Sequence, residues 1–168
     1  MTRTRLQSAP ALLALFLAAA LAQDGLVPKT PIVIAVPTEP VAVAPGGIVR
    51  VELRFRVSPG YHINSSKPRS EFLIPTRLKL SPPAGLTPGA VVYPEGRDLS
   101  FALSPKEKLN VYAGDFTVRA ELRAPSSTAA GSYQVPGELR YQACNDRACF
   151  PPAKLPVEFE VTVRKPRS

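Results

Sequence analysis

Residues 141–152 read Tyr-Gln-Ala-Cys-Asn-Asp-Arg-Ala-Cys-Phe-Pro-Pro and contain both cysteines of the chain, Cys144 and Cys149. The four residues between the cysteines include an asparagine and an aspartate, which favour turns. Apolar and polar residues alternate before this stretch, in 138–142, and after it, in 156–163. Two alternating runs around a short polar loop predict a β-hairpin with the cysteines facing each other at its mouth. Opposed residues of an antiparallel pair lie at Cα distances that a disulfide can bridge.

Tyr141 and Ala143 share one parity along this predicted strand, and Cys144 has the other. The Cys144 sulfur is therefore expected to point away from the core, towards solvent or a covering loop. A disulfide across so short a loop would stabilise the fold by roughly 2 kcal/mol, less than a bond across a longer loop. This small gain slightly favours redox chemistry. From spacing alone, however, a structural staple in an exported protein is the better interpretation.

Alternation continues outward along the chain and is clearest in 49–57, where apolar residues at odd positions alternate with charged or polar ones. Shorter runs bring the expected total to about eight strands, with no helix. The 20 prolines fall between and at the ends of these runs, which suits a β protein with frequent turns. Residues 94–108 lack a clear period and are predicted to form a long loop with apolar residues at its tip. The expected fold is all-β, an immunoglobulin-like β-sandwich whose cysteines bridge neighbouring strands and not the two sheets.

The first residues are basic, 11–20 are apolar, and Ala20-Leu21-Ala22 fits a small-x-small cleavage site. The apolar run is too short to span a bilayer. These features predict an exported, periplasmic protein that begins at Gln23 and has no membrane span after cleavage. The expected organisation is a signal peptide (1–22), a linker (23–30), one domain (31–163) and a basic tail (164–168).

The sequence offers few residues for nucleic-acid binding, metal or haem binding, or hydrolysis. The net charge of +8 is spread over strand faces, and no nucleic-acid-binding motif occurs. Zinc needs about four ligands, whereas Cys144, Cys149 and His62 supply three at most. The single methionine is Met1, which argues against copper(I), and no haem-attachment motif is present. Ser-His-Asp hydrolysis would have only His62 as its base. No metal or cofactor is therefore expected, and thiol–disulfide chemistry or simple binding remains.

Several segments together resemble one family, the N-terminal periplasmic domains of the thiol:disulfide interchange protein DsbD. The most specific is the cysteine stretch, YQAC followed by CFPP. Supporting segments are Gly60–Ser65, Phe72–Thr76, Tyr93–Gly96 and Val111–Gly114. The resemblance spans roughly 31–163 and implies an immunoglobulin-like fold with a redox-active cysteine pair. It also implies that the domain takes electrons from a thioredoxin-like domain. It would pass them to periplasmic disulfide isomerases and cytochrome-maturation thioredoxins.

Two departures from the family affect these expectations. The sequence lacks the membrane-spanning electron-transfer domain and the thioredoxin-like domain. Its partners would then be separate thioredoxin-like redox proteins or a separate membrane electron-transfer protein. Some relatives also have five residues between the cysteines, where this chain has four.

The resemblance assigns Cys149 as the cysteine that joins the partner and Cys144 as the one that resolves the mixed disulfide. Arg147 would favour a thiolate electrostatically and Asp146 would oppose it, unless both simply belong to a solvated turn. Tyr141 would pack beside the sulfurs or, more simply, in the core.

The family's cap loop, which covers the cysteines, would fall in 97–104, with Leu99 and Phe101 as candidate covering residues. Two hypotheses follow. The first is an exported protein thiol–disulfide oxidoreductase that relays electrons between thioredoxin-like proteins through Cys144 and Cys149. The second is a non-enzymatic immunoglobulin-like binding module whose hairpin disulfide is structural.

Overall fold

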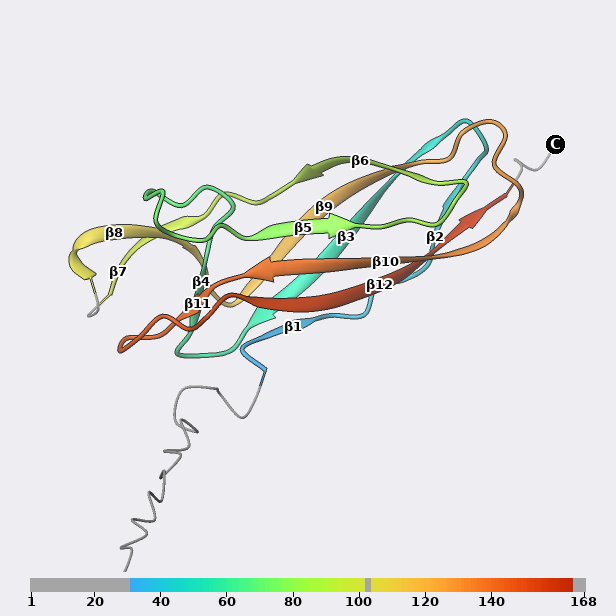
Figure 1. Cartoon of the computed structure of the whole chain (residues 1–168). Coiled ribbons are helices and arrows are strands. Elements are labelled where there is room, and N and C mark those ends of the chain that lie inside the picture. The colour runs from blue at the N-terminus through green and yellow to red at the C-terminus, as the bar shows by residue number, and fades with distance from the viewer. Residues whose placement is uncertain (1–30, 102–103, 165–168) are drawn as a thin grey trace, which may run out of the picture.

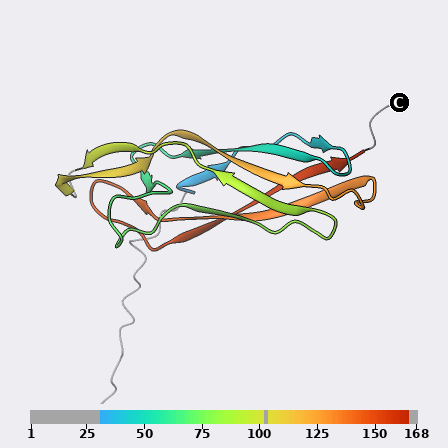
Figure 2. The ribbon, with the colours of Figure 1, turned by 90° about the horizontal axis from the view of Figure 1, so that it is seen from above.

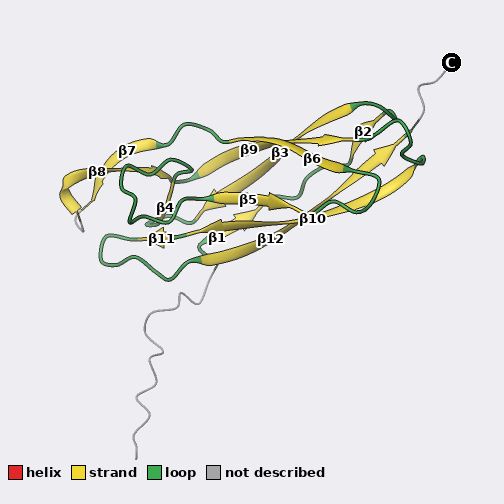
Figure 3. Cartoon of the chain, turned by 45° about the horizontal axis from the view of Figure 1, so that its top comes forward, coloured by secondary structure: helices red, strands yellow, loops and turns green. Residues whose placement is uncertain are grey.

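The structure, a computed structural model, describes residues 31–101 and 104–164 of the chain. These residues form twelve β-strands and no helix (Figure 3). This part of the chain therefore contains no helix with the length and apolar character needed to cross a membrane. The predicted signal peptide (1–22), the linker (23–30) and residues 165–168 of the predicted tail lie outside the described residues.

The first sheet has the strand order β1-β3-β9-β6. Its members are β1 (Val33–Ala35), β3 (Ile48–Val57), β9 (Asp115–Arg123) and β6 (Thr87–Val92). The alternation in 49–57 places apolar side chains on one face of β3, and burial follows the same period from Val51 onward. Its antiparallel partner β9 aligns Val51 with Ala120 and Phe55 with Phe116.

The second sheet has the order β2-β12-β10-β5. Its members are β2 (Val41–Val43), β12 (Ala153–Val163), β10 (Gly131–Tyr141) and β5 (Arg77–Leu80). β10 and β12 form the long hairpin that the sequence predicts around the cysteine stretch, from Gly131↔Val163 to Tyr141↔Ala153. β2 is added in parallel to the far end of β12.

The two sheets face each other as two layers (Figure 2). Their inner faces share one core, to which each of the four long strands contributes residues that are almost inaccessible to solvent: Val51, Leu53, Phe55, Val118, Val135, Phe159 and Val161. This arrangement is the immunoglobulin-like sandwich that the strand pattern predicts.

A third, smaller sheet at one end of the sandwich has the order β11-β4-β8-β7. Its members are β11 (Ala143–Cys144), β4 (His62–Asn64), β8 (Ser104–Tyr112) and β7 (Arg97–Phe101). The β7–β8 hairpin extends beyond the end of the two main sheets (Figure 1). The prediction of a long loop over 94–108 is therefore wrong. Residues 97–101 and 104–112 are paired strands, aligned by Arg97↔Val111 and Leu99↔Leu109.

Candidate functional site

The disulfide joins Cys144 and Cys149 just beyond the end of the β10–β12 hairpin, with a Cα–Cα distance of 3.9 Å. The cysteines are not the last rung of that hairpin. After Tyr141 the chain leaves β12, and Cys144 pairs with His62 of β4 on one side and with Cys149 on the other. The disulfide therefore lies where the long hairpin meets the third sheet.

A tight turn holds the two cysteines together through backbone and side-chain hydrogen bonds. Asn145 N donates to Ala148 O over 2.9 Å, and Asn145 Oδ1 accepts from the backbone nitrogens of Arg147 and Ala148, each at 2.9 Å. Phe150 N donates to Ala143 O over 2.8 Å. Because none of these contacts involves sulfur, the turn has its own support when the disulfide opens.

The two cysteines differ sharply in solvent exposure. Cys144 is fully buried at 0% exposure, whereas Cys149 is exposed. Pro151 and Pro152, which are also exposed, follow Cys149 and cannot donate backbone hydrogen bonds. A sulfur of another protein would thus reach Cys149 first. From the sequence, the Cys144 sulfur is expected to face either solvent or a covering loop. Exposure to solvent is wrong, because Cys144 is completely buried.

Next to Cys144, residues of β4 and β7 pack against each other. The ring of Phe101, at the end of β7, stacks on the imidazole of His62 with a centroid distance of 3.7 Å and an angle of 14° between planes. His62 is the cross-strand partner of Cys144 and is itself 2% exposed. The Phe101 ring thus stacks on the side chain of the residue that pairs with the buried cysteine.

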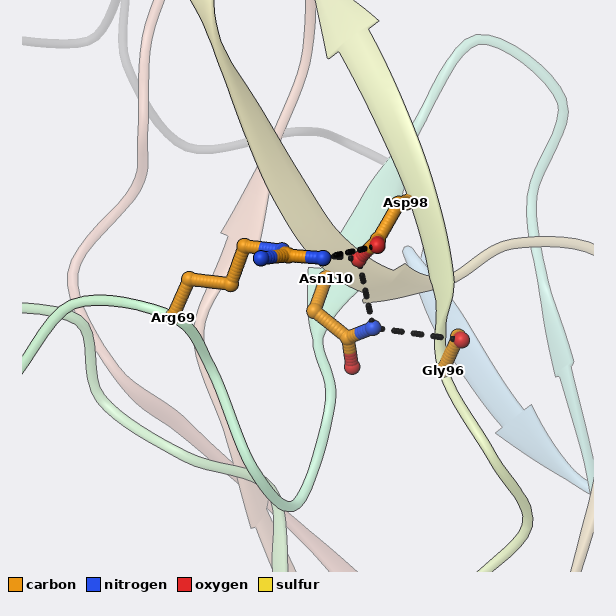
Figure 4. Close-up of polar contacts among 4 residues, drawn as sticks. All are labelled: Arg69, Gly96, Asp98 and Asn110. Atoms are coloured by element: carbon orange, nitrogen blue, oxygen red, sulfur yellow. Dashed lines mark hydrogen bonds and ion pairs between the residues drawn. The ribbon is translucent and has the colours of Figure 1, made fainter.

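Polar contacts fix the base of the β7–β8 hairpin to the loop after β4 (Figure 4). Arg69 forms a two-pronged ion pair with Asp98, and Asn110 Nδ2 donates to Asp98 Oδ1 at 2.8 Å and to Gly96 O at 3.2 Å. Hydrogen bonds from Arg69 and Asn110 lower the pKa of Asp98 to about 2. A Cβ atom at position 96 would lie 2.1 Å from Asn110 Oδ1 and 2.7 Å from Ser65 Cβ, so a larger residue there would have to displace these side chains.

A stack of aromatic rings joins the hairpin base to the sandwich core. Tyr112 lies 4.8 Å from Phe116, which lies 5.2 Å from Phe55, measured between ring centroids. The buried Tyr112 hydroxyl contacts Ser66 N, Ser66 Oγ and Pro94 O at 3.0–3.1 Å. The base of the hairpin is therefore fixed, while its Phe101 end rests on His62.

Gln142 ties the cysteine turn to the same loop. Its Oε1 accepts hydrogen bonds from Asn64 Nδ2 at 3.2 Å and from Ile74 N at 3.4 Å, and its Nε2 donates to Phe150 O at 3.3 Å. Tyr61 and Phe150 also meet beside the turn, with ring centroids 5.9 Å apart. The turn that carries the cysteines is thus held to β4 and to the loop after it by hydrogen bonds of Gln142 and by the contact between Tyr61 and Phe150.

The remaining predicted site residues divide between core and surface. Tyr141 is 7% exposed and belongs to the apolar core, and burial raises the pKa of its phenol. Asp146 and Arg147 are exposed at the tip of the turn. Leu99 is half-buried opposite Leu109 on β8.

Three residues around the disulfide received no role in redox chemistry from the sequence: His62, Gln142 and Asn145. Asn145 has a recognisable signal, since asparagine commonly caps a turn through its side chain. As a lone histidine His62 suggests only a metal ligand or a hydrolytic base, and its pairing with a segment 82 residues later is not visible in a local pattern. Gln142 has no local signal at all.

An all-β sandwich that carries a disulfide between one buried and one exposed cysteine is the arrangement of a thiol–disulfide interchange domain. Residues 33–160 match the family described as "Thiol:disulfide interchange protein DsbD, N-terminal". The chain belongs to this family. No curated protein matches the chain.

Among solved structures, the N-terminal periplasmic domain of ScsB from Proteus mirabilis matches with a TM-score of 0.50 and 14% identity, over 76% of this chain and 44% of that one. The DsbD N-terminal domain of Neisseria meningitidis, in the reduced form, matches with a TM-score of 0.38 and 25% identity, over 67% of this chain and 75% of that one. A type I cohesin of Pseudobacteroides cellulosolvens matches with a TM-score of 0.49 and 16% identity, over 78% of this chain and 92% of that one. The chain thus spans less than half of the ScsB structure, and that likeness concerns the fold alone.

Proposed function

We propose that this domain relays electrons between thioredoxin-like proteins by opening and closing the Cys144–Cys149 disulfide. The observation that carries the proposal is the asymmetry of the pair. Cys149 is exposed while Cys144 is completely buried, in a chain of the DsbD N-terminal family. A structural staple has no need of this asymmetry, whereas an exchange reaction needs one sulfur that a partner can reach and one that cannot be captured.

The exchange runs through a mixed disulfide. In the direction that reduces a partner, the Cys149 thiolate attacks a sulfur of the partner disulfide and releases the other partner sulfur as a thiolate. Cys144 then attacks Cys149, which breaks the intermolecular bond and frees the partner as a dithiol. Two electrons pass to the partner, and the Cys144–Cys149 disulfide re-forms. In the opposite direction, a reduced donor attacks Cys149 and Cys144 is the leaving group.

The β7–β8 hairpin acts in this scheme as a cap over the buried half of the pair. Phe101 covers His62 and, through it, Cys144. The fixed base at Asp98, Asn110 and Tyr112 would let the Phe101 end move without loss of the hairpin. Docking of a partner beside Cys149 would displace this end, and its return would cover Cys144 again.

The cellular setting proposed for this reaction is an exported compartment, with residues 1–22 removed as a signal peptide. Donor and acceptor would be thioredoxin-like redox proteins or a separate membrane electron-transfer protein. The basis is the family of the chain and the signal-like residues at its start. The intact mass of the exported protein tests this part, since a chain that still carried residues 1–22 in a membrane fraction would contradict it.

Trapping the mixed disulfide tests the relay. The Cys144→Ser variant keeps its attacking thiol but lacks a resolver, so it should accumulate an adduct with a thioredoxin-like protein, detectable by mass spectrometry. The matched Cys149→Ser variant should trap little, because its remaining thiol is buried. If neither variant forms an adduct and the wild-type pair is never found reduced, the disulfide is structural and the domain is a binding module.

A further inference from the structure

The position of His62 links it directly to the chemistry of the disulfide. His62 and Cys144 are directly opposed across the antiparallel β4–β11 pair, and Cys149 bridges to the other side of Cys144. Directly opposed residues of an antiparallel pair project from the same face of a sheet, with Cβ atoms about 4.5–5.5 Å apart. The imidazole, the buried cysteine and the exposed cysteine thus form one row.

The imidazole is enclosed, and one of its nitrogens has no hydrogen-bond partner. His62 is 2% exposed and lies beneath the Phe101 ring. Its Nε2 atom is buried without a partner among the described residues. Buried polar atoms are nearly always paired, so an unpaired one needs an explanation. A disulfide carries no proton that could bond to this nitrogen, whereas a reduced Cys144 would bring a thiol S–H next to the ring.

We propose that His62 is the proton acceptor for the Cys144 thiol at the step in which Cys144 resolves the mixed disulfide. This inference rests on the exchange reaction proposed above. It assigns the base that speeds the second step of that reaction, the attack of Cys144 on Cys149. The row formed by His62, Cys144 and Cys149 is the observation that carries it.

Burial creates the need for such a group. Only a thiolate attacks a disulfide, and a thiol in apolar surroundings is hard to deprotonate. Cys144 is 0% exposed, and its neighbours Ala143 and Ile63 are 2% and 0% exposed. Water therefore has no ready access to the Cys144 proton, and the proton must leave through a side chain. His62 is the cross-strand neighbour that can take it.

The electrostatic surroundings suit a base that becomes charged only briefly. Burial lowers the pKa of His62, and the Asp146 carboxylate on the cysteine turn partly opposes this shift. The ring is thus neutral and able to accept a proton near pH 7, and Asp146 would stabilise the resulting imidazolium. Among the described side chains, the other charged groups on the strands beside β4 are Arg97 and Asp98 on β7 and Glu107 and Lys108 on β8, and none of these four is a cause of the shift in the His62 pKa.

The step balances as follows. In the mixed disulfide Cys144 is a thiol, and its proton passes to the neutral imidazole as its sulfur attacks Cys149. The Cys144–Cys149 bond forms, the bond between Cys149 and the partner breaks, and the partner leaves as a thiolate. The imidazolium then gives its proton to solvent when the cap opens. In the reverse direction the imidazolium protonates Cys144 as the leaving group.

A small aromatic disulfide separates the two halves of the reaction. We would mix the reduced protein with one equivalent of 5,5′-dithiobis(2-nitrobenzoate) in a stopped-flow instrument. The first thionitrobenzoate released reports attack by Cys149, and the second reports resolution by Cys144. His62→Gln keeps a polar side chain of similar reach but cannot act as a base, and Thr128→Val is the control for loss of a buried polar group far from the site.

His62→Gln should slow the second phase at least about tenfold at pH 7, because an ordinary thiol of pKa about 8.5 is then only a few per cent thiolate. The second phase of the wild type should change little above pH 7, whereas that of His62→Gln should rise almost tenfold per pH unit until the pH approaches the thiol pKa of about 8.5. Free imidazole should partly restore the second phase in His62→Ala. Asp146→Asn should slow it severalfold, and Thr128→Val should leave both phases unchanged.

The outcomes distinguish this inference from the proposed function. If both phases occur in the wild type and His62→Gln matches it at every pH, the proton-acceptor role is wrong while the relay stands. If His62→Gln speeds both phases, His62 only holds the cap closed, and the role is again wrong. If the wild type shows no second phase and exchanges with no thioredoxin, the proposed function itself fails. Thermal melts of the oxidised variants would confirm that each is folded.

Discussion

At the scale of single residues, Phe101 makes the ring contact with the buried His62. Its ring lies 3.7 Å from the imidazole of His62, measured between centroids, at the end of a strand whose base is fixed. Truncating this ring should therefore expose the imidazole and, behind it, Cys144, without disturbing the sandwich.

We expect Phe101→Ala to speed the alkylation of Cys144 by iodoacetamide in the reduced protein at least about threefold, because local opening is no longer opposed by the ring stack. Phe72→Ala is the matched control, since the Phe72 side chain is 88% exposed and should leave the rate unchanged. Equal rates in wild type and Phe101→Ala would remove the cap assignment, although not the exchange reaction.

His62 should also make the stability of the oxidised protein depend on pH. Burial lowers its pKa below the ordinary 6.5, so between that folded-state pKa and about 6.5 the unfolded chain holds a proton that the folded chain lacks. Its contribution is complete above about pH 6.5 and is lost as the pH falls through the folded-state pKa. Within that window the loss has a limiting slope of about 1.4 kcal/mol per pH unit.

Urea unfolding of the wild type and of His62→Gln at several pH values measures this contribution. The difference between the two free energies of unfolding cancels the titration of the acidic residues. We expect the free energy of unfolding of the wild type, relative to that of His62→Gln, to fall as the pH drops below about 6.5. Parallel curves over the whole range would mean that His62 titrates alike in the folded and unfolded chains.

At the scale of secondary-structure elements, the β7–β8 hairpin depends on Tyr112 for its anchor. Tyr112→Phe keeps the ring stack with Phe116 but removes the hydroxyl that contacts Ser66 and Pro94. Leaving these buried groups unsatisfied should lower the free energy of unfolding by about 1–3 kcal/mol. It should also raise hydrogen exchange in β7 and β8.

Tyr133→Phe is the matched control for this prediction. The Tyr133 hydroxyl also donates one hydrogen bond, to Ala129 O at 2.8 Å, but that bond is exposed to solvent. Its loss should change the free energy of unfolding by less than about 0.5 kcal/mol. Similar losses in the two variants would show that Tyr112 does not anchor the hairpin specifically.

The same elements show what a sequence pattern can and cannot predict. Alternation predicted β3, β9 and the β10–β12 hairpin, because each of these strands has one face on the core and one in solvent. The β7–β8 hairpin extends past the sandwich and has little core to face, so only weak alternation marks it, and it was predicted to be a loop.

The site was harder to predict than the sandwich for a similar reason. The cysteine pair and its neighbouring turn residues stand together in the sequence, and the family resemblance covered them. The pairing of Cys144 with His62, in contrast, depends on strands of two and three residues that lie far apart in the chain. Strands this short hold no period, so no local pattern could place the imidazole beside the sulfur.

At the scale of the whole molecule, stability and chemistry occupy different parts of the structure. The core is formed by the long strands of the two main sheets, and residues such as Val51, Val118, Val135 and Val161 are completely buried in it. The disulfide lies outside this core, beyond the end of β10, and closes a turn with a sequence separation of 5. The core therefore does not need the disulfide in order to form.

Reduction should accordingly leave the domain folded. A loop this short contributes only about 2 kcal/mol to stability, which corresponds to a fall in Tm of roughly 5–10 °C for a domain of this size. The hydrogen bonds of Asn145, together with Phe150 N to Ala143 O, should also hold the cysteine turn without the S–S bond. Thermal melts followed by circular dichroism, with and without reductant, measure the change, and a Cys144→Ala/Cys149→Ala double variant controls for side effects of the reductant. If the reduced protein unfolded at room temperature, the disulfide would be a structural staple, because a carrier has to remain folded in both of its oxidation states.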